Sequence, residues 1–126
     1  MDTNTLVTSG HSIVEAMDRA NISPKLAMWV HNEESETWKL WLLPQSINVK
    51  IDAQNFYRKM SVLISENRPN LGGIDISDLE LIPPKHPVIE GMKRFIRAEG
   101  LNSIHLSGNT YNGFYLPDGI LLRSTL

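Results

Sequence analysis

Two apolar runs joined by a short acidic link constrain the fold of this chain more than any other feature. The runs cover residues 26–30 and 38–43, and the link over residues 32–37 reads Asn-Glu-Glu-Ser-Glu-Thr. A strand with one solvent-facing side alternates between apolar and polar residues, whereas apolar residues here occupy both parities of each run. The pattern predicts an antiparallel hairpin over residues 25–43 with both faces covered.

The register of this hairpin decides which apolar side chains share a face. Pairing Asn32 with Thr37 places Ala27, Trp29, Trp38, Leu40 and Leu42 on one face. The other face then carries Leu26, Met28, Val30, Trp41 and Leu43. All three tryptophans of the chain lie in this hairpin. The sequence does not say whether the same chain or a partner covers the second face.

Three further segments have helical periodicity. Apolar residues at helical spacing predict amphipathic helices over about residues 5–20, 53–66 and 87–99. Asp52 is expected to cap the second helix. Gly100 is expected to end the third helix in a left-handed conformation.

The remaining segments favour strands. Residues 47–51 alternate in polarity, which predicts a short half-buried strand or an extended connector. A strand over residues 74–82 changes parity in its middle, so a bulge or break is expected there. Strands over residues 103–124 contain hairpin-turn pairs at 112–113 and 118–119. The two pairs leave only residues 114–116 as a strand between them, which is short for two tight turns. We therefore expect the second pair to close a true hairpin and the first to form a bulge or wider loop.

Together these elements predict one α+β domain in which a mostly antiparallel sheet packs against three amphipathic helices. The length of 126 residues suits a single domain with its own core, and 41% hydrophobic with 21% charged residues is typical of a globular protein. The absence of cysteine excludes disulfide bonds and thiolate chemistry.

Charge and targeting signals narrow the class of protein further. The net charge of −2 gives no electrostatic reason for tight, non-specific binding to nucleic acid. No apolar run approaches the ~20 residues that span a bilayer, and the first residues lack the basic and apolar regions of a secretory signal. We therefore expect a cytoplasmic protein without membrane association.

The standard catalytic motifs are missing, and His105 is the strongest remaining candidate for chemistry. The sequence has no phosphate-binding glycine loop, no His-Glu-x-x-His and no Gly-x-Ser-x-Gly. His105 lies among hydroxyl and amide side chains, where an imidazole can act as a general acid or base. Paired with His31 or His86, it would suit a small metal-independent hydrolase or nuclease. The alternative is a histidine on a solvent-facing strand.

Metal and nucleic-acid sites have weaker support. Residues 31–36 combine an imidazole with three carboxylates, but their spacing matches no ligand arrangement, so we expect neither a metal nor a cofactor. Lys93, Arg94 and Arg97 form a basic patch on the third helix that could contact nucleic acid. Because Glu90 precedes Arg94 by four residues, ordinary pairing on a helix surface explains the patch as well.

The leading hypothesis is a protein–protein interaction module without catalytic activity of its own. Such a module would be a homodimer that associates through the tryptophan-rich sheet, or an accessory, inhibitor or immunity-type subunit bound to a companion protein. Tryptophan and tyrosine are the usual energetic anchors of interfaces. The candidate contact residues are Trp29, Trp38, Trp41, Met28 and Tyr115. The alternative is ordinary core packing beneath the helices, which we expect for two of the tryptophans.

Overall fold

The computed structural model describes residues 2–45, 49–93 and 97–126, and it confirms the predicted α+β class. Its helices are α1 (Thr3–Arg19), α2 (Val49–Asn67) and α3 (Pro87–Lys93). Its strands are β1 (Pro24–Asn32), β2 (Thr37–Pro44), β3 (Leu79–Leu81), β4 (Ile104–Leu106), β5 (Asn109–Tyr111), β6 (Phe114–Leu116) and β7 (Gly119–Ser124).

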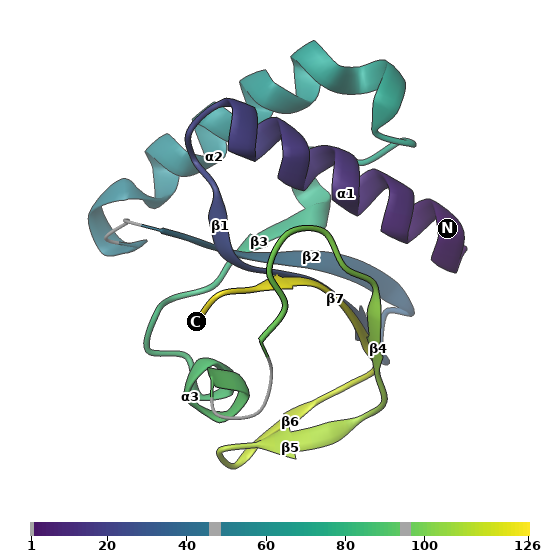
Figure 1. Cartoon of the computed structure of the whole chain (residues 1–126), viewed down its shortest axis with the longest axis vertical. Coiled ribbons are helices and arrows are strands. Elements are labelled where there is room, and N and C mark those ends of the chain that lie inside the picture. Colours follow the sequence, from purple (N-terminus) through teal and green to yellow (C-terminus); the bar gives the residue numbers. More distant parts are fainter. Residues whose placement is uncertain (1, 46–48, 94–96) are drawn as a thin grey trace.

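Five of the strands form one sheet with helices on both of its faces. The strand order is β3-β2-β1-β7-β4, and only the β2–β3 pair is parallel. Strands β5 and β6 form a separate two-stranded sheet. Figure 1 shows α1 and α2 above the five-stranded sheet, and α3 and the β5–β6 hairpin below it.

The predicted register of the first hairpin is confirmed. Asn32 lies opposite Thr37, and Trp29 lies opposite Leu40. The side-chain oxygen of Asn32 accepts hydrogen bonds from the backbone N–H groups of Glu34 and Ser35 at 2.9 and 3.1 Å, which stabilises the turn. The two sets of apolar side chains face opposite sides of the sheet, as the alternation predicted.

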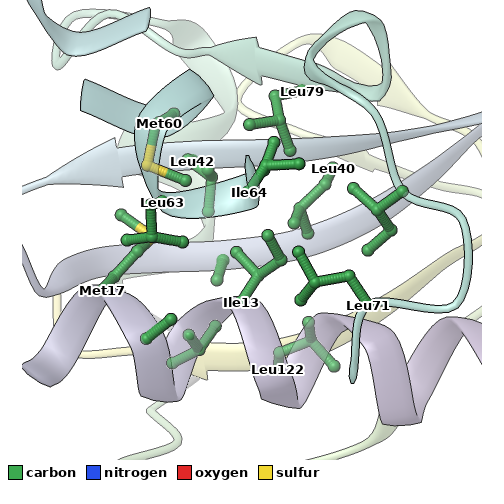
Figure 2. Close-up of a cluster of buried hydrophobic side chains, with 14 of the residues drawn as sticks. Ile13, Met17, Leu40, Leu42, Met60, Leu63, Ile64, Leu71, Leu79 and Leu122 are labelled. Carbon is green, nitrogen blue, oxygen red and sulfur yellow. The ribbon is translucent and has the colours of Figure 1, made fainter. Parts of the chain in front are cut away.

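Helices α1 and α2 cover the first face with the stripes that their periodicity predicted. Trp29 lies beneath α1 and donates a hydrogen bond from its indole nitrogen to the carbonyl oxygen of Leu6 at 2.7 Å. Gly10 makes room for this ring, because a Cβ there would lie 2.8 Å from the indole nitrogen. Figure 2 shows the aliphatic centre of this core, including Ile13, Met17, Leu40, Leu42, Met60, Leu63, Ile64, Leu71, Leu79 and Leu122.

The second face is covered by the same chain. Helix α3 and the β5–β6 hairpin bury the side chains that β1 and β2 direct to this side. A Cβ at Gly91 would lie 2.6 Å from the Cβ of Tyr111 and 2.9 Å from its backbone carbonyl carbon. Glycine therefore lets the hairpin lie directly against α3.

The expectation that residues 118–119 close the C-terminal hairpin is wrong. Tyr111 pairs with Phe114, and the two residues between them, Asn112 and Gly113, have φ angles of 51° and 79°. Two left-handed residues form the turn type that suits a two-residue hairpin loop. Gly119 instead allows β7 to lie close to β1, since a Cβ there would lie 2.8 Å from the carbonyl oxygen of Trp29.

Two boundaries of α2 and β3 differ from the expectations. Helix α2 begins at Val49, so the predicted strand is wrong for residues 49–51 and Asp52 is not a cap, while residues 46–48 lie outside the described residues. The predicted strand 74–82 is short, because a 3-10 helix occupies Ile76–Asp78 and leaves only Leu79–Leu81 extended. The expected break in that strand is confirmed.

The predicted third helix is too long at its C-terminal end. Helix α3 is described to Lys93, residues 94–96 lie outside the described residues, and Ala98 forms an isolated β-bridge with Ser124. A residue in a β-bridge cannot continue the helix to Glu99. Gly100 does have the expected left-handed conformation, with φ 74°, but it lies in the loop that follows the bridge.

Candidate functional site

The predicted contact residues differ widely in exposure. Met28 and Trp29 are 0% and 1% exposed, so they belong to the core and offer no surface to a partner. Trp41 is buried at the edge of the second face, and half-buried Trp38 packs against the ring of His31 with centroids 5.0 Å apart. Tyr115 is 54% exposed and is the candidate with a large free surface. The sequence left open what covers the second face of the hairpin, and in the structure α3 and the β5–β6 hairpin cover it.

The structure does not bring His105 to a second histidine. His105 pairs with Ile120, which pairs with Trp29, so His105 and His31 face the same side of the sheet from strands two places apart. Strand spacing then separates their backbones by about 10 Å. His86 lies on the opposite side of the sheet, 5.5 Å from the ring of Trp41. In the described residues, the ring of His105 makes no contact with the ring of His31 or of His86.

His86 has a structural environment at the start of α3. Its Nδ1 accepts a hydrogen bond from the backbone N–H of Val88 at 3.2 Å, and its ring packs edge-on against Phe114 at 4.6 Å. Burial lowers the pKa of His86, while the charge of Glu80 acts in the opposite direction. The neutral ring therefore fits this position best.

Two of the three residues of the basic patch, Lys93 and Arg97, are described, and each lies beside a carboxylate. Lys93 lies 3.9 Å from the carboxylate of Glu90, and Arg97 lies 2.6 Å from that of Glu99. Arg94 lies outside the described residues, and Arg97 lies beyond the end of α3 as described. In the described ranges no group of His, Asp or Glu side chains is arranged to hold a metal ion.

A different part of the surface is formed by a segment without charged side chains. Residues 101–116, which we call the uncharged segment, contain no Asp, Glu, Lys, Arg or Pro, although 21% of the chain is charged. The segment contains three of the four exposed large hydrophobic residues in the described part of the chain. These are Leu101 at 42%, Ile104 at 40% and Tyr115. Tyr115 also lies against Gly108, just beyond the end of β4, because a Cβ at Gly108 would lie 3.1 Å from its ring.

The hydrogen bonds between β1 and β7 fix the direction of the β7 backbone. The N–H of His31 donates to the carbonyl oxygen of Asp118 at 2.9 Å. Bonded and non-bonded pairs alternate in an antiparallel ladder, so Ile120, two residues further along, also directs its N–H and C=O toward β1. The residues on either side of Ile120 direct theirs toward β4.

The same alternation directs the backbone groups of His105 toward the outer edge of β4. The neighbours of Ile120 pair with Ile104 and Leu106, which use their own backbone groups for these bonds. His105 therefore directs its N–H and C=O away from the sheet. Since β4 is the last strand in the sheet, no strand in the described ranges takes up these two groups.

Two long-range contacts hold the start of the uncharged segment. The Nε2 of His11 on α1 donates to the carbonyl oxygen of Asn102 at 2.6 Å. Arg123 donates to the carbonyl oxygen of Gly100 at 2.9 Å and forms two hydrogen bonds with the carboxylate of Asp18, at 2.7 and 2.9 Å. The hydrogen bonds from Arg123 lower the pKa of Asp18. These contacts fix the loop that leads into β4.

The C-terminal end of β4 is fixed by Asp118. The carboxylate of Asp118 accepts a hydrogen bond from the backbone N–H of Gly108 at 2.9 Å. The edge of β4 is therefore held at both ends, and a strand that binds there would meet an ordered edge.

Sequence reasoning selected Tyr115 and noticed His105, but it missed Leu101 and Ile104. The absence of charged residues across 101–116 was a signal in the sequence that could have identified all four residues.

Comparisons with known protein families, curated proteins and solved structures find no match to this chain. In the described residues, no helix has the length and apolar character needed to cross a bilayer.

Proposed function

We propose that this protein acts through protein–protein contact, and that it forms a homodimer by pairing β4 of one copy with β4 of another. The observation that carries this proposal is the free backbone edge at His105 within a segment that has no charged side chain. Natural proteins usually protect an exposed strand edge with lysine, proline or inward-pointing charge. None of these residues occurs in the uncharged segment.

A twofold axis at His105 makes this edge complementary to itself. Antiparallel pairing about this axis places His105 opposite its counterpart, and Ser103 opposite Ser107 of the second copy. Ile104 would then lie opposite Leu106 of the second copy, on the face that carries α3. Apolar residues that lie directly opposite in paired strands stabilise a sheet, and no pair of like charges opposes the contact.

Leu101 and Tyr115 extend this contact beyond the strand. One pair of three-residue strands contributes few hydrogen bonds, and a stable interface buries roughly 1,000 Å² or more. The two side chains flank the edge, since Leu101 precedes β4 and Tyr115 lies beside Gly108 at its end. Exposed apolar surface on both sides of the strand supplies the additional area.

Light scattering coupled to gel filtration tests the proposal at micromolar concentration. We expect the wild-type protein to elute as a dimer and His105→Pro as a monomer. The proline removes an N–H that points away from the sheet, so the bonds between β4 and β7 remain. The melting temperature of the variant is therefore expected to stay near that of the wild type.

A second variant and its control test the contact through charge. Ile104→Lys introduces a cation beside the twofold axis and should also give a monomer. Gln54→Lys adds the same charge at an exposed position on α2 and should leave the dimer intact. A monomeric wild-type protein, or a dimer that survives both edge variants, would overturn the proposal.

A further inference from the structure

A groove lies between the C-terminal ends of α1 and α2, and none of its lining residues belongs to the uncharged segment. Its volume is about 770 Å³. The lining residues are Ala16, Arg19, Ala20, Ile22, Arg58, Lys59, Val62, Leu63, Glu66 and Asn67. Most of these side chains are exposed, so the groove is open to solvent along its length.

The base of the groove is apolar, and the side formed by the end of α1 carries small side chains. Val62 is 54% exposed, and it is the large hydrophobic residue that the described helices leave in solvent. Ile22 and Leu63 lie beside it, and α1 contributes the small side chains of Ala16 and Ala20. Small residues on a helix allow another backbone to approach closely.

The rim of the groove is cationic, although the chain as a whole has a net charge of −2. Arg19, Arg58 and Lys59 line the groove together with one carboxylate, that of Glu66. In the described part of the chain these three cations form no ion pair, and Arg19 makes one long hydrogen bond of 3.4 Å to Asn67. The cations are therefore available to an anionic partner.

We propose that this groove binds an acidic amphipathic helix of a partner protein. Along α2 the lining extends from Arg58 to Asn67, which corresponds to about 15 Å of helix axis. About three turns of a second helix fit this length, with the apolar stripe on Val62 and carboxylates beside the cations. A small anionic amphiphile fits less well, because ligand sites bury roughly 70–90% of the ligand surface and an open groove does not.

A displayed library of helices tests the proposal directly. Each library member carries a fixed apolar stripe at i, i+3, i+4 and i+7, and each flanking position is varied among Glu, Lys and Gln. We expect selection on the full-length protein to enrich Glu at the flanking positions. An enriched peptide should bind about tenfold more tightly than its Lys counterpart, which corresponds to about 1.4 kcal/mol.

Substitutions in the groove and a matched control complete the test. Val62→Glu should abolish binding of the enriched peptide, and Arg58→Glu with Lys59→Glu should reverse the preference toward Lys peptides. Lys85→Glu makes the same charge reversal in the exposed turn before α3 and should leave binding unchanged. All of these positions lie outside the uncharged segment, so light scattering on the same proteins reports separately on the β4 dimer.

Several outcomes would overturn the proposal. A library that yields no binder, or binders with no excess of Glu, removes the acidic helix as the occupant. Binding of laurate micelles or anionic vesicles that Val62→Glu abolishes, without any peptide binding, would assign the groove to a lipid. A dimer that Val62→Glu converts to a monomer would assign it to a second copy of the chain.

Discussion

The two faces of the sheet carry similar numbers of apolar side chains, but the chain covers them in different ways. Two long helices, α1 with 17 residues and α2 with 19, cover the first face. The second face is covered by α3 with 7 residues and by two strands of 3 residues each. Alternation along β1 and β2 requires that both faces be buried, but it does not specify what buries them.

This difference has a consequence for stability. The helices of the first face have continuous apolar stripes, so several turns of each helix contribute buried side chains to the core. An isolated two-stranded hairpin is at best marginally stable in water, so the β5–β6 hairpin depends on its contact with α3 and the sheet. We therefore expect substitutions on the first face to lower global stability, and substitutions on the second face to loosen its cover locally.

The largest expected effect comes from the two buried tryptophans. Trp29→Ala should lower the free energy of unfolding by about 3–5 kcal/mol, because it removes a fully buried ring. It also removes the hydrogen bond to Leu6. Trp41→Ala should cost less, at about 3 kcal/mol, since the rings of His86 and Phe114 can partly close the space. Urea unfolding measures both values, with half-buried Trp38→Ala as the smaller control. A larger loss for Trp41→Ala than for Trp29→Ala would contradict the proposed ranking of the two faces.

A smaller effect is expected at the contact between α3 and the hairpin. Gly91→Ala places a Cβ against the backbone of Tyr111, and overpacking of this kind costs about 1–3 kcal/mol. The gain in helix propensity, about 1 kcal/mol, offsets part of this cost. We expect a net loss of about 1 kcal/mol. Hydrogen exchange should show faster exchange in residues 109–116, whereas the amides of α1 should be unchanged. Equal acceleration in both regions would mean that the second face does not open separately.

The sequence predicted the first hairpin in full because its signals are local. An acidic link with one favourable register and apolar residues on both parities specify the pairing and both faces. The C-terminal hairpin was predicted wrongly because two turn pairs compete within a few residues. Local turn chemistry fits both pairs. The choice depends on the close approach of Gly119 to Trp29, which lies on a strand distant in sequence.

The candidate site was less predictable than the fold. The contacts that fix the β4 edge join Asp18 to Arg123 and His11 to Asn102, and no sequence pattern links residues so far apart. The boundary of α2 was predicted wrongly for a different reason. Residues 49–51 continue a short alternation of polar and apolar residues, but they form the first turn of α2, because so short an alternation is a weak signal.

The smallest of the three expected effects is a pH dependence of the second face through His86. Its Nδ1 accepts the N–H of Val88, which only the neutral ring can do, and burial lowers its pKa from 6.5. A lowered pKa in the folded state means that this stabilisation is complete above about pH 6.5 and is lost as the pH falls through the folded-state pKa. Urea midpoints at pH 7.5 and 5.5 should therefore differ more for the wild-type protein than for His86→Gln. His86→Gln leaves the other three histidines of the chain in place, so the difference between the two proteins isolates His86. Faster hydrogen exchange in residues 109–116 at the lower pH, seen only with the wild-type protein, would locate the effect in the cover of the second face. Identical pH dependence in the two proteins would show that protonation of His86 does not loosen this cover.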